Sequence, residues 1–366
     1  MADKNLQRDT LRKLQKTNNS RLIPLKIEYS EKSKLLTGYV NKLVNVNRIY
    51  PRHLPTQASF RWSTVNPPIT NWPRECINIT CPQTEHEWTD VCWSIRDILT
   101  CDTDEVLITW DHDNIEGKIH DLIVNDTVAI TAHQEGQDLH TITCCNIFSY
   151  NLPVNLVNPH THCTCEAEHN TTSNSRERPV VCVHCAWRSK YNWQGKDTKQ
   201  RVLAKNFNHG SKYTKTHKFV HRIQGVEKYG ITKHHLEQLA KRYIESKGDS
   251  WQRKLQLIAG IQRSRISRTL YGGRRVFFDS SEETGREGFS HMISGTVSDY
   301  NNETLNILHI SLGDSVRLLH NAHDGDKIAI KKDSVPSIAE LKQMIERDIT
   351  YQGRALTMTA GVKVYK

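Results

Sequence analysis

The hydrophobic pattern of the chain predicts a few strands set among longer helices. The stretch "EVLITWD" carries a short apolar run with β-branched residues, which predicts a buried strand. In "SVRLLHNAHDGDKIAIKK", two apolar runs flank a His-Asp-Gly-Asp stretch, which predicts a strand, a tight turn and a second strand. Residues 196–267 show helical spacing, for example at Leu236, Leu239 and Tyr243.

The rest of the pattern sets the expected fold class. "ALTMTAGVKVY" predicts a closing strand, residues 35–44 have weak helical periodicity, and residues 51–75 are rich in Pro, Thr and Asn, which predicts extended or looped chain. Strands and helices mix without a regular strand–helix–strand alternation. This mixture favours an α+β fold.

Composition adds a polyanionic partner to this picture. The 366 residues carry a formal net charge of +10, which suits nucleic acid or an anionic membrane surface. No apolar run is long enough to cross a bilayer, and the polar N-terminus lacks the apolar segment of a secretory signal. We therefore expect no membrane partner and a cytoplasmic location, where the ten cysteines are thiols or metal ligands.

Two aspartates stand at the ends of predicted strands. Asp111 closes the "LITWD" run, and Asp324 lies in the turn of the predicted hairpin. Carboxylates on rigid elements are ligands that Mg²⁺ uses beside water and substrate phosphates. Each residue alone predicts only a turn, because Asp favours turns. Read beside a cluster of cations, the pair predicts a site for two Mg²⁺ ions and phosphoryl transfer.

That cluster is a predicted helix with cations and rings on one face. Arg201, Lys205, His209 and Tyr213 stand four residues apart, so a helix places them in one stripe. No member is aliphatic, which is unlike a stripe that faces a core. Cations suit a triphosphate and rings suit a sugar or base, although a solvated basic face has the same pattern.

A cysteine-rich island precedes this helix at residues 158–190. One Cys-x-Cys pair and one Cys-x2-Cys pair fit a tetrahedral zinc site that would hold together a segment with few apolar residues. The predicted zinc ligands are Cys163, Cys165, Cys182 and Cys185. Other candidate ligands in the island are His160, His162, His169 and His184. Free thiols on a loop are the alternative.

Several of these stretches resemble motifs of family A DNA polymerases, the bacterial polymerase I type. "DHDNIEGKI" resembles the family's first motif, "RVLAKNFNHGSKY" the motif of the fingers helix, and "NAHDGD" the His-Asp-Glu motif. Positions in register are Asp111, Ile115, Glu116, Arg201, Lys205, Asn208, Gly210, Tyr213, His323 and Asp324. Four more stretches match in the family's order: "FRWSTVNPPITNWP", "QEGQDLHT", "RTLYGGRR" and "REGFSHMISGTVSD". The resemblance covers about residues 50–366.

The resemblance implies the palm and fingers of a polymerase right hand. It implies an antiparallel palm sheet, helical fingers and a zinc-type insertion, with the thumb mostly absent. The resemblance implies four parts. Residues 1–50 are a helical or linker segment that remains of the thumb, and residues 51–130 are the first part of the palm. Residues 131–260 are the fingers, which include the cysteine-rich insertion at 158–190, and residues 261–366 are the second part of the palm.

The implied activity is template-directed DNA synthesis, in which dNTPs are added to a primer 3′-hydroxyl by two-metal nucleotidyl transfer. Asp111 and Asp324 would hold two Mg²⁺ ions, and Lys205 would protonate the leaving group. Residues implied to bind the dNTP are Arg201, His140, His209, Tyr213 and Glu116, with Glu116 excluding a 2′-hydroxyl. Residues implied to lie near the primer-template are Arg61, Asn71, Arg286, Ser294 and His323.

The chain departs from the family pattern at several positions. His209 replaces the ring that is usually Phe or Tyr, and Ser294 replaces a longer Gln. The Glu of the His-Asp-Glu motif is Gly325, with Asp326 following it. His112 replaces a Tyr, and Thr214 replaces a Gly. These substitutions remove neither predicted metal ligand and neither cation of the stripe.

The resemblance also suggests partners and origin. We expect primer-template DNA, dNTPs and a separate polypeptide that carries the thumb and an exonuclease, as in a split polymerase of a phage-like replicon in a host cytoplasm. Two other functions remain open. One is a single-subunit RNA polymerase, and the other is a zinc-containing DNA-binding accessory subunit without activity.

Overall fold

The computed structural model describes residues 22–44, 46–54, 57, 60–69, 72, 100–148, 199–223, 231–321 and 324–365. The chain forms two compact units. The first comprises Met1–Leu54 and Ser63–Thr100, and the second comprises Pro55–Trp62 and Cys101–Lys366. Some predicted site residues lie outside the described residues: Asn71, Cys163, Cys165, Cys182, Cys185 and His323.

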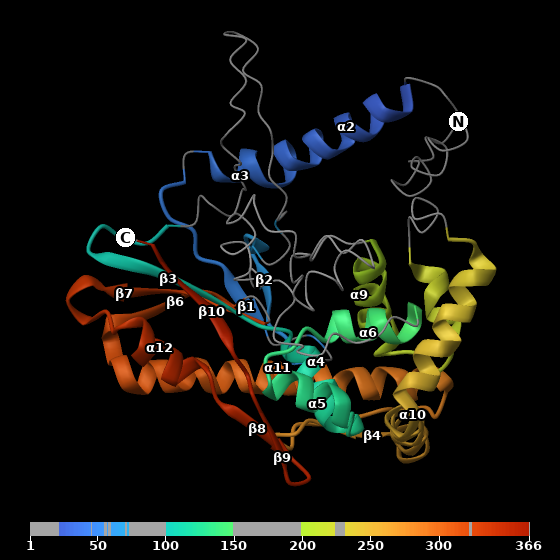
Figure 1. The fold of residues 1–366 in the computed structure, drawn as a ribbon. Coiled ribbons are helices and arrows are strands. Elements are labelled where there is room, and N and C mark those ends of the chain that lie inside the picture. Colours follow the sequence, from blue (N-terminus) through green and yellow to red (C-terminus); the bar gives the residue numbers. More distant parts are fainter. Residues whose placement is uncertain are drawn as a thin grey trace, which may run out of the picture. The chain divides into compact units, whose positions relative to one another are not determined.

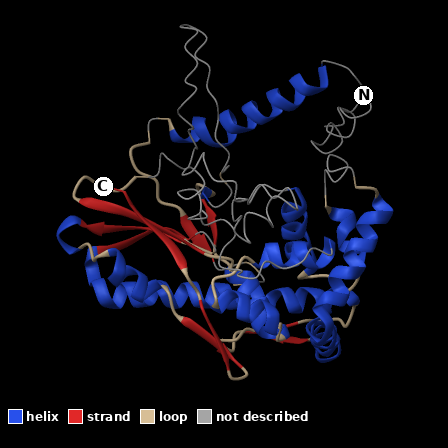
Figure 2. Cartoon of the chain, viewed as in Figure 1, coloured by secondary structure: helices blue, strands red, loops and turns tan. Residues whose placement is uncertain are grey.

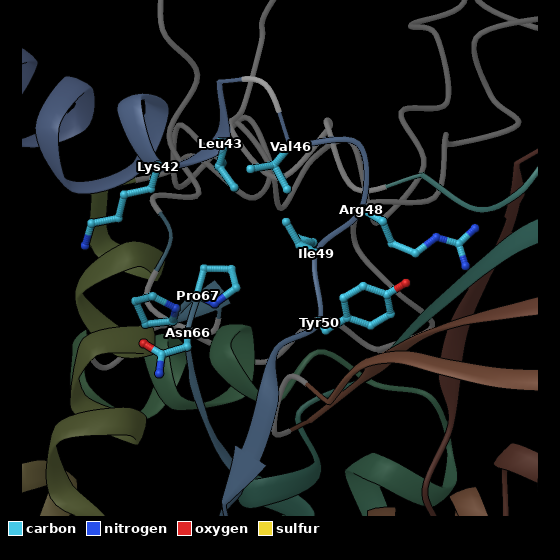
Figure 3. A pocket seen from close by; sticks show the side chains of 9 residues that line it. Lys42, Leu43, Val46, Arg48, Ile49, Tyr50, Asn66 and Pro67 are labelled. Atoms are coloured by element: carbon cyan, nitrogen blue, oxygen red, sulfur yellow. The ribbon is translucent and has the colours of Figure 1, made fainter.

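The first unit has a small core of its own. Its described elements are α2 (Leu22–Leu35), α3 (Asn41–Leu43), β1 (Arg52–Leu54) and β2 (Ser63–Val65), with the two strands antiparallel. Ile69 and Trp72 are buried, and Leu43 and Ile49 pack against them. A pocket in this unit has an apolar lining, with Lys42 and Arg48 on opposite sides of it (Figure 3).

A four-stranded antiparallel sheet organises one end of the second unit. Its strand order is β10-β3-β7-β6 (Figure 1). The strands are β3 (Glu105–His112), β6 (Val316–Asn321), β7 (Asp326–Lys331) and β10 (Ala360–Tyr365). The predicted strand in "EVLITWD" and the predicted hairpin are confirmed. β3 lies between β10 and β7, and its alternate residues Val106, Ile108 and Trp110 are buried.

The predicted closing strand is instead two strands that change partner. β9 (Arg354–Thr357) pairs with β8 (Asp348–Tyr351), whereas β10 pairs with β3. Figure 2 draws the strands in red in the same view as Figure 1. The change occurs because Met358 is fully buried in a different core cluster from Ala360. The Met358 N–H donates to the carbonyl of Arg347 at 2.9 Å. An apolar run can predict extended chain, but it does not reveal a change of partner within the run.

Helices make up the rest of the second unit. They are α4 (Ile115–Val124), α5 (Thr127–Gln134), α6 (Leu139–Phe148), α9 (Lys199–Ser211), α10 (Lys233–Ser264), α11 (Glu282–Leu312) and α12 (Ile338–Ile345). A short hairpin of β4 (Ile266–Arg268) and β5 (Arg274–Val276) joins α10 to α11. In the described ranges, no helix is both long and apolar enough to cross a membrane.

Three larger apolar clusters, besides a small one between α5 and α6, hold the second unit together. One joins α4, the C-terminal end of α10 and α11, with Phe289 and Ile293 at its centre. A second joins α6, α9 and the N-terminal part of α10 through Phe207 and Leu239. The third lies between the sheet and one face formed by α11 and α12. Polar side chains can therefore meet where these clusters adjoin.

A short segment, Phe60 to Trp62, contacts α11 at two places along its length. The Phe60 ring packs edge-to-face on His291, with centroids 4.8 Å apart. The Trp62 indole N–H donates to the Asn302 side-chain oxygen at 2.7 Å. Both flanking rings are thus fixed to one helix, which determines where Arg61 lies.

Tyr300 joins α11 to the chain beyond α12, and we expect its hydroxyl to matter for stability. It is fully buried, donates to the Ile345 carbonyl at 2.7 Å and accepts from the Arg347 N–H at 2.8 Å. Tyr300→Phe should lower the free energy of unfolding by about 1–3 kcal/mol, because both backbone groups lose a partner. Denaturant unfolding measures this, with the exposed Tyr365→Phe as control. Equal stability of the two variants would contradict the expectation.

Candidate active site

The two predicted catalytic aspartates lie on neighbouring segments. Asp111 is exposed near the end of β3, and Asp324 is half-buried in the turn between β6 and β7. The His112 N–H donates to the Asp324 carbonyl at 2.8 Å, so the residue after Asp111 is bonded directly to Asp324. Two carboxylates from distant parts of the sequence are thereby carried by adjacent backbone.

Gly325 explains how the turn comes so close. A Cβ at this position would lie 2.0 Å from the Trp110 carbonyl oxygen and 2.9 Å from the Asp111 Cα. Any other residue would push the turn away from β3. The family's Glu is therefore excluded at this position by close packing, and Asp326 is buried at the start of β7.

The loop after β3 is fixed on its other side by the start of β10. The Asp113 N–H donates to the Thr359 carbonyl at 2.9 Å, and the Thr359 hydroxyl donates to the Asp113 carboxylate at 3.2 Å. The buried Lys118 donates to the Thr357 carbonyl at 2.9 Å and to the Thr359 hydroxyl at 2.8 Å. The chain that follows Asp111 is thus held against the segment that leads into β10.

Glu116, in the first turn of α4, is the centre of a four-residue polar cluster. Its carboxylate forms an ion pair with Arg61 and accepts from Ser294 at 3.1 Å and from the Tyr213 hydroxyl at 3.3 Å. Arg61 also donates to the Ser294 hydroxyl at 3.2 Å. Burial, reinforced by the Glu116 charge, raises the pKa of Tyr213. Arg61 and Ser294, which are predicted to lie near the primer-template, therefore contact the same carboxylate as Tyr213, which is predicted to bind the nucleotide.

α9 presents two of its predicted residues to solvent. Leu203, Ala204 and Phe207 form its buried face, which leaves Lys205 and His209 exposed on the opposite side. Arg201 is placed differently: it is buried, and its guanidinium donates to Asp138 at 2.6 and 2.8 Å. Arg201 thus fixes the N-terminal part of α9 to α6.

The predicted stripe does not continue to Tyr213 on the helix, because α9 ends at Ser211. The Ser211 carbonyl accepts from the Lys254 ammonium at 2.9 Å and from the Thr214 N–H at 3.3 Å. These contacts take the carbonyl that a continuing helix would use. Tyr213 therefore leaves the stripe and turns toward Glu116.

His140 and His209 lie close together beside the cations of α9. Their ring centroids are 5.6 Å apart, and the Asn208 amide donates to His140 Nδ1 at 2.9 Å. Partial desolvation lowers the pKa of each imidazole to about 4, although the His209 side chain also reaches solvent; nearby cations, including Lys205, act in the same direction. Both rings are therefore neutral at neutral pH, next to a positive helix face.

Arg286 lies apart from the Glu116 cluster. It forms an ion pair with Glu283 in the first two turns of α11, whereas Ser294 lies two turns further along that helix. The structure thus brings together Asp111 with Asp324, and Arg61 with Glu116, Tyr213 and Ser294. It places His140 beside His209, and Arg201 against Asp138.

Asp138 is the main site residue that motif reading missed. Besides holding Arg201, its carboxylate accepts from the His140 N–H at 3.3 Å and from the Thr141 hydroxyl at the start of α6. Hydrogen bonds from Arg201 and Thr141 outweigh burial and lower its pKa. Its position just before an apolar helical run is the signal that could have found it, because Asp is a preferred N-cap.

Comparison with solved structures identifies the fold. The chain is similar to the polymerase domain of Pol1 from M. smegmatis, solved in complex with a DNA primer-template and dNTP. The TM-score is 0.66 and the sequence identity is 16%; the match covers 98% of this chain and 55% of that chain. No model of a protein family matches, and neither does any curated protein.

The class that this establishes is one of fold: a polymerase domain of the bacterial DNA polymerase I type. At this identity the likeness carries no residue roles and no activity for this chain. The predicted roles of individual residues, the domain boundaries, the zinc site, the split gene, the phage origin and the cytoplasmic location stay predictions.

The lowered pKa of His140 makes stability depend on pH. The unfolded imidazole titrates near 6.5 and the folded one near 4, so the unfolded chain binds more protons between these values. The neutral His140 imidazole therefore contributes fully to the free energy of unfolding above pH 6.5, and this contribution is lost as the pH falls toward 4. When the pH is lowered from 7 to 4.5, the free energy of unfolding should fall by roughly 1–3 kcal/mol less in His140→Gln than in the wild type. Denaturant unfolding at several pH values tests this, and parallel pH profiles would contradict it.

Proposed function

We propose that the protein is a DNA-directed DNA polymerase that adds dNTPs to a primer 3′-hydroxyl by two-metal nucleotidyl transfer. The observation that carries the proposal is the backbone contact at 2.8 Å that joins the end of β3, beside Asp111, to Asp324. The likeness to a polymerase domain with primer-template and dNTP supports it. The primer 3′-oxygen bonds to the α-phosphorus, and the bond to pyrophosphate breaks.

The carboxylates of Asp111 and Asp324 fit Mg²⁺. They are hard oxygen ligands, and Asp111 is exposed where a substrate can approach. Among the residues that the structure describes, no group of three or more acidic, His or Cys side chains is placed to bind a metal ion. This suits a cation that completes its shell with water and substrate phosphates. When bound, such ions lower the pKa of the primer hydroxyl and neutralise the leaving pyrophosphate.

The helix α9 supplies positive charge for the triphosphate. Lys205 is exposed and suits both binding of a phosphate and donation of a proton to the leaving pyrophosphate. His209, one turn further along, offers a ring to the nucleotide, with His140 beside it. Arg201 donates to Asp138, so we assign it first to positioning α9; a direct phosphate contact requires that pair to open.

Glu116 is proposed to select the sugar. Its carboxylate is held by Arg61, Tyr213 and Ser294, so its position is fixed before a nucleotide arrives. A fixed carboxylate under the sugar leaves no room for a 2′-hydroxyl. Arg61, which is proposed to lie near the primer, is bound to Glu116 in the same cluster. The end of the primer and the sugar of the nucleotide would therefore contact neighbouring residues.

The partners follow from charge and fold. A net charge of +10 favours a DNA duplex, and Arg286 on α11 is proposed to contact it. A structural zinc in the cysteine-rich stretch and a separate polypeptide that carries the thumb and an exonuclease, in a split polymerase of phage type, remain part of the proposal on sequence grounds.

Primer extension with Asp324→Asn tests the proposal most simply. Asn keeps the shape of the side chain and leaves the backbone contact to His112 intact. We expect the rate to fall by roughly a thousandfold or more while primer-template binding is retained, because one metal ligand loses its charge. Asp333→Asn, at an exposed position beyond β7, is the matched control. Equal rates for the two variants would remove this mechanism.

The same assay separates the other functions. Extension with rNTPs in preference to dNTPs would identify an RNA polymerase. Binding of primer-template without any extension, in Mg²⁺ and in the presence of dNTPs, would favour the accessory subunit.

Glu116→Ala should specifically weaken sugar discrimination. Removal of the carboxylate opens space for the 2′-hydroxyl, so the ratio of dNTP to rNTP kcat/KM should fall by roughly ten- to a hundredfold. Glu245→Ala, at an exposed glutamate on α10, should leave the ratio unchanged. A loss of dNTP use with no gain in relative rNTP use would show that Glu116 is not the gate.

A further inference from the structure

A buried lysine contacts the C-terminal end of α9. Lys254 on α10 is only 2% exposed. Its ammonium donates to the Ser211 carbonyl at 2.9 Å and lies 3.1 Å from the centre of the Trp251 ring. Within the described part of the chain, it forms no ion pair. Burial, together with the nearby Lys247 charge, lowers the pKa of this amine.

Such a lysine costs stability instead of adding to it. Taking an amine out of water is unfavourable, and one carbonyl and one ring compensate only in part. An apolar side chain of the same length would avoid that cost, and in comparable sites such a replacement is often neutral or stabilising. Lys247 is different: it is paired with the Asp126 carboxylate at 2.7 Å. The position of Lys254 therefore calls for a reason other than stability.

Ser211 is held from two directions by one kinked helix. Tyr243, before the kink in α10, shares a hydrogen bond of 2.8 Å between its hydroxyl and the Ser211 hydroxyl. The ammonium of Lys254, after the kink, donates a hydrogen bond to the Ser211 carbonyl. The kink is at Gly248, whose φ of 46° and ψ of −123° are non-helical and favour glycine. Both arms of α10 thereby converge on the last residue of α9.

The fixed residue lies between the groups proposed to face the nucleotide. His209 is two positions before Ser211, and Tyr213 is two positions after it. Tyr213 contacts Glu116, and His209 contacts His140. A shift of Ser211 would therefore move the His209 ring and Tyr213 together, and with Tyr213 one of the three contacts that hold Glu116.

We infer that Lys254 is a positioning residue that, with Tyr243, fixes the C-terminal end of α9 and so sets the nucleotide pocket. It acts through Ser211 and touches no substrate. The inference rests on the proposed function for its kinetic consequence, whereas the fixing of α9 itself is a property of the fold.

Lys254→Met tests the inference, because Met fills the same volume and cannot bond the carbonyl. We expect the melting temperature to be unchanged or higher, and kcat/KM for dNTP to fall by roughly tenfold, as for one charged hydrogen bond lost. Primer-template affinity should be unchanged. Tyr243→Phe removes the other contact, and the double variant should lose less than the product of the two single losses, since both act on Ser211.

Lys247→Met is the matched control on the same helix. It should lower the melting temperature, because Asp126 is left buried and unpaired, and it should leave kcat/KM per folded molecule unchanged. Amide hydrogen exchange gives a readout that needs no activity: Lys254→Met should speed exchange at residues 207–213, and Lys247→Met should not.

Each result supports or overturns the inference. The inference is overturned if Lys254→Met leaves both kcat/KM and amide exchange unchanged. It is also overturned if the variant melts at a lower temperature and its loss of activity is no larger than the fraction of molecules that are unfolded. If the wild-type protein extends no primer, the proposed function fails. The exchange experiment then still decides whether Lys254 fixes α9.

Discussion

The register between β3 and the β6–β7 turn is the constraint on which the site depends. The His112 N–H bonds the Asp324 carbonyl, and Gly325 allows the turn to lie against the Trp110–Asp111 peptide. Both interactions involve only backbone atoms, so the position of the two segments relative to each other does not depend on the side chains of Asp111 and Asp324. Antiparallel pairing of β3 with β7 continues this register into the sheet.

Around this centre, each further functional group is held by a contact with a neighbouring element. Arg201 fixes one end of α9 to α6 through Asp138, and Lys254 fixes the other end to α10. Glu116 is fixed by three partners, of which Arg61 comes from the short segment clamped on α11. The apolar clusters provide the rigid bodies, and these polar contacts lie where they adjoin. The arrangement leaves Lys205 and His209 exposed on α9 between its two fixed ends.

The sequence predicted those features that are local. Apolar runs located β3 and the hairpin, and helical spacing located α9 and α10. The meeting of Asp111 with Asp324 came from a resemblance, because no periodicity encodes a contact between strands so far apart in the chain. The end of α9 at Ser211 was not predictable, since it depends on a lysine from another helix taking the carbonyl. The Arg201–Asp138 pair was missed for the same reason: both residues have ordinary local explanations, and only the fold joins them.

The central claim is that Asp111 and Asp324 share divalent cations. The most direct measurement is an anomalous difference map from crystals of the protein grown with primer-template, dNTP and Mn²⁺. If the two aspartates share cations, strong peaks lie in contact with both carboxylates and adjacent to the triphosphate. Peaks bound to only one of these aspartates, or Mn²⁺ held elsewhere while the nucleotide is in place, would contradict it.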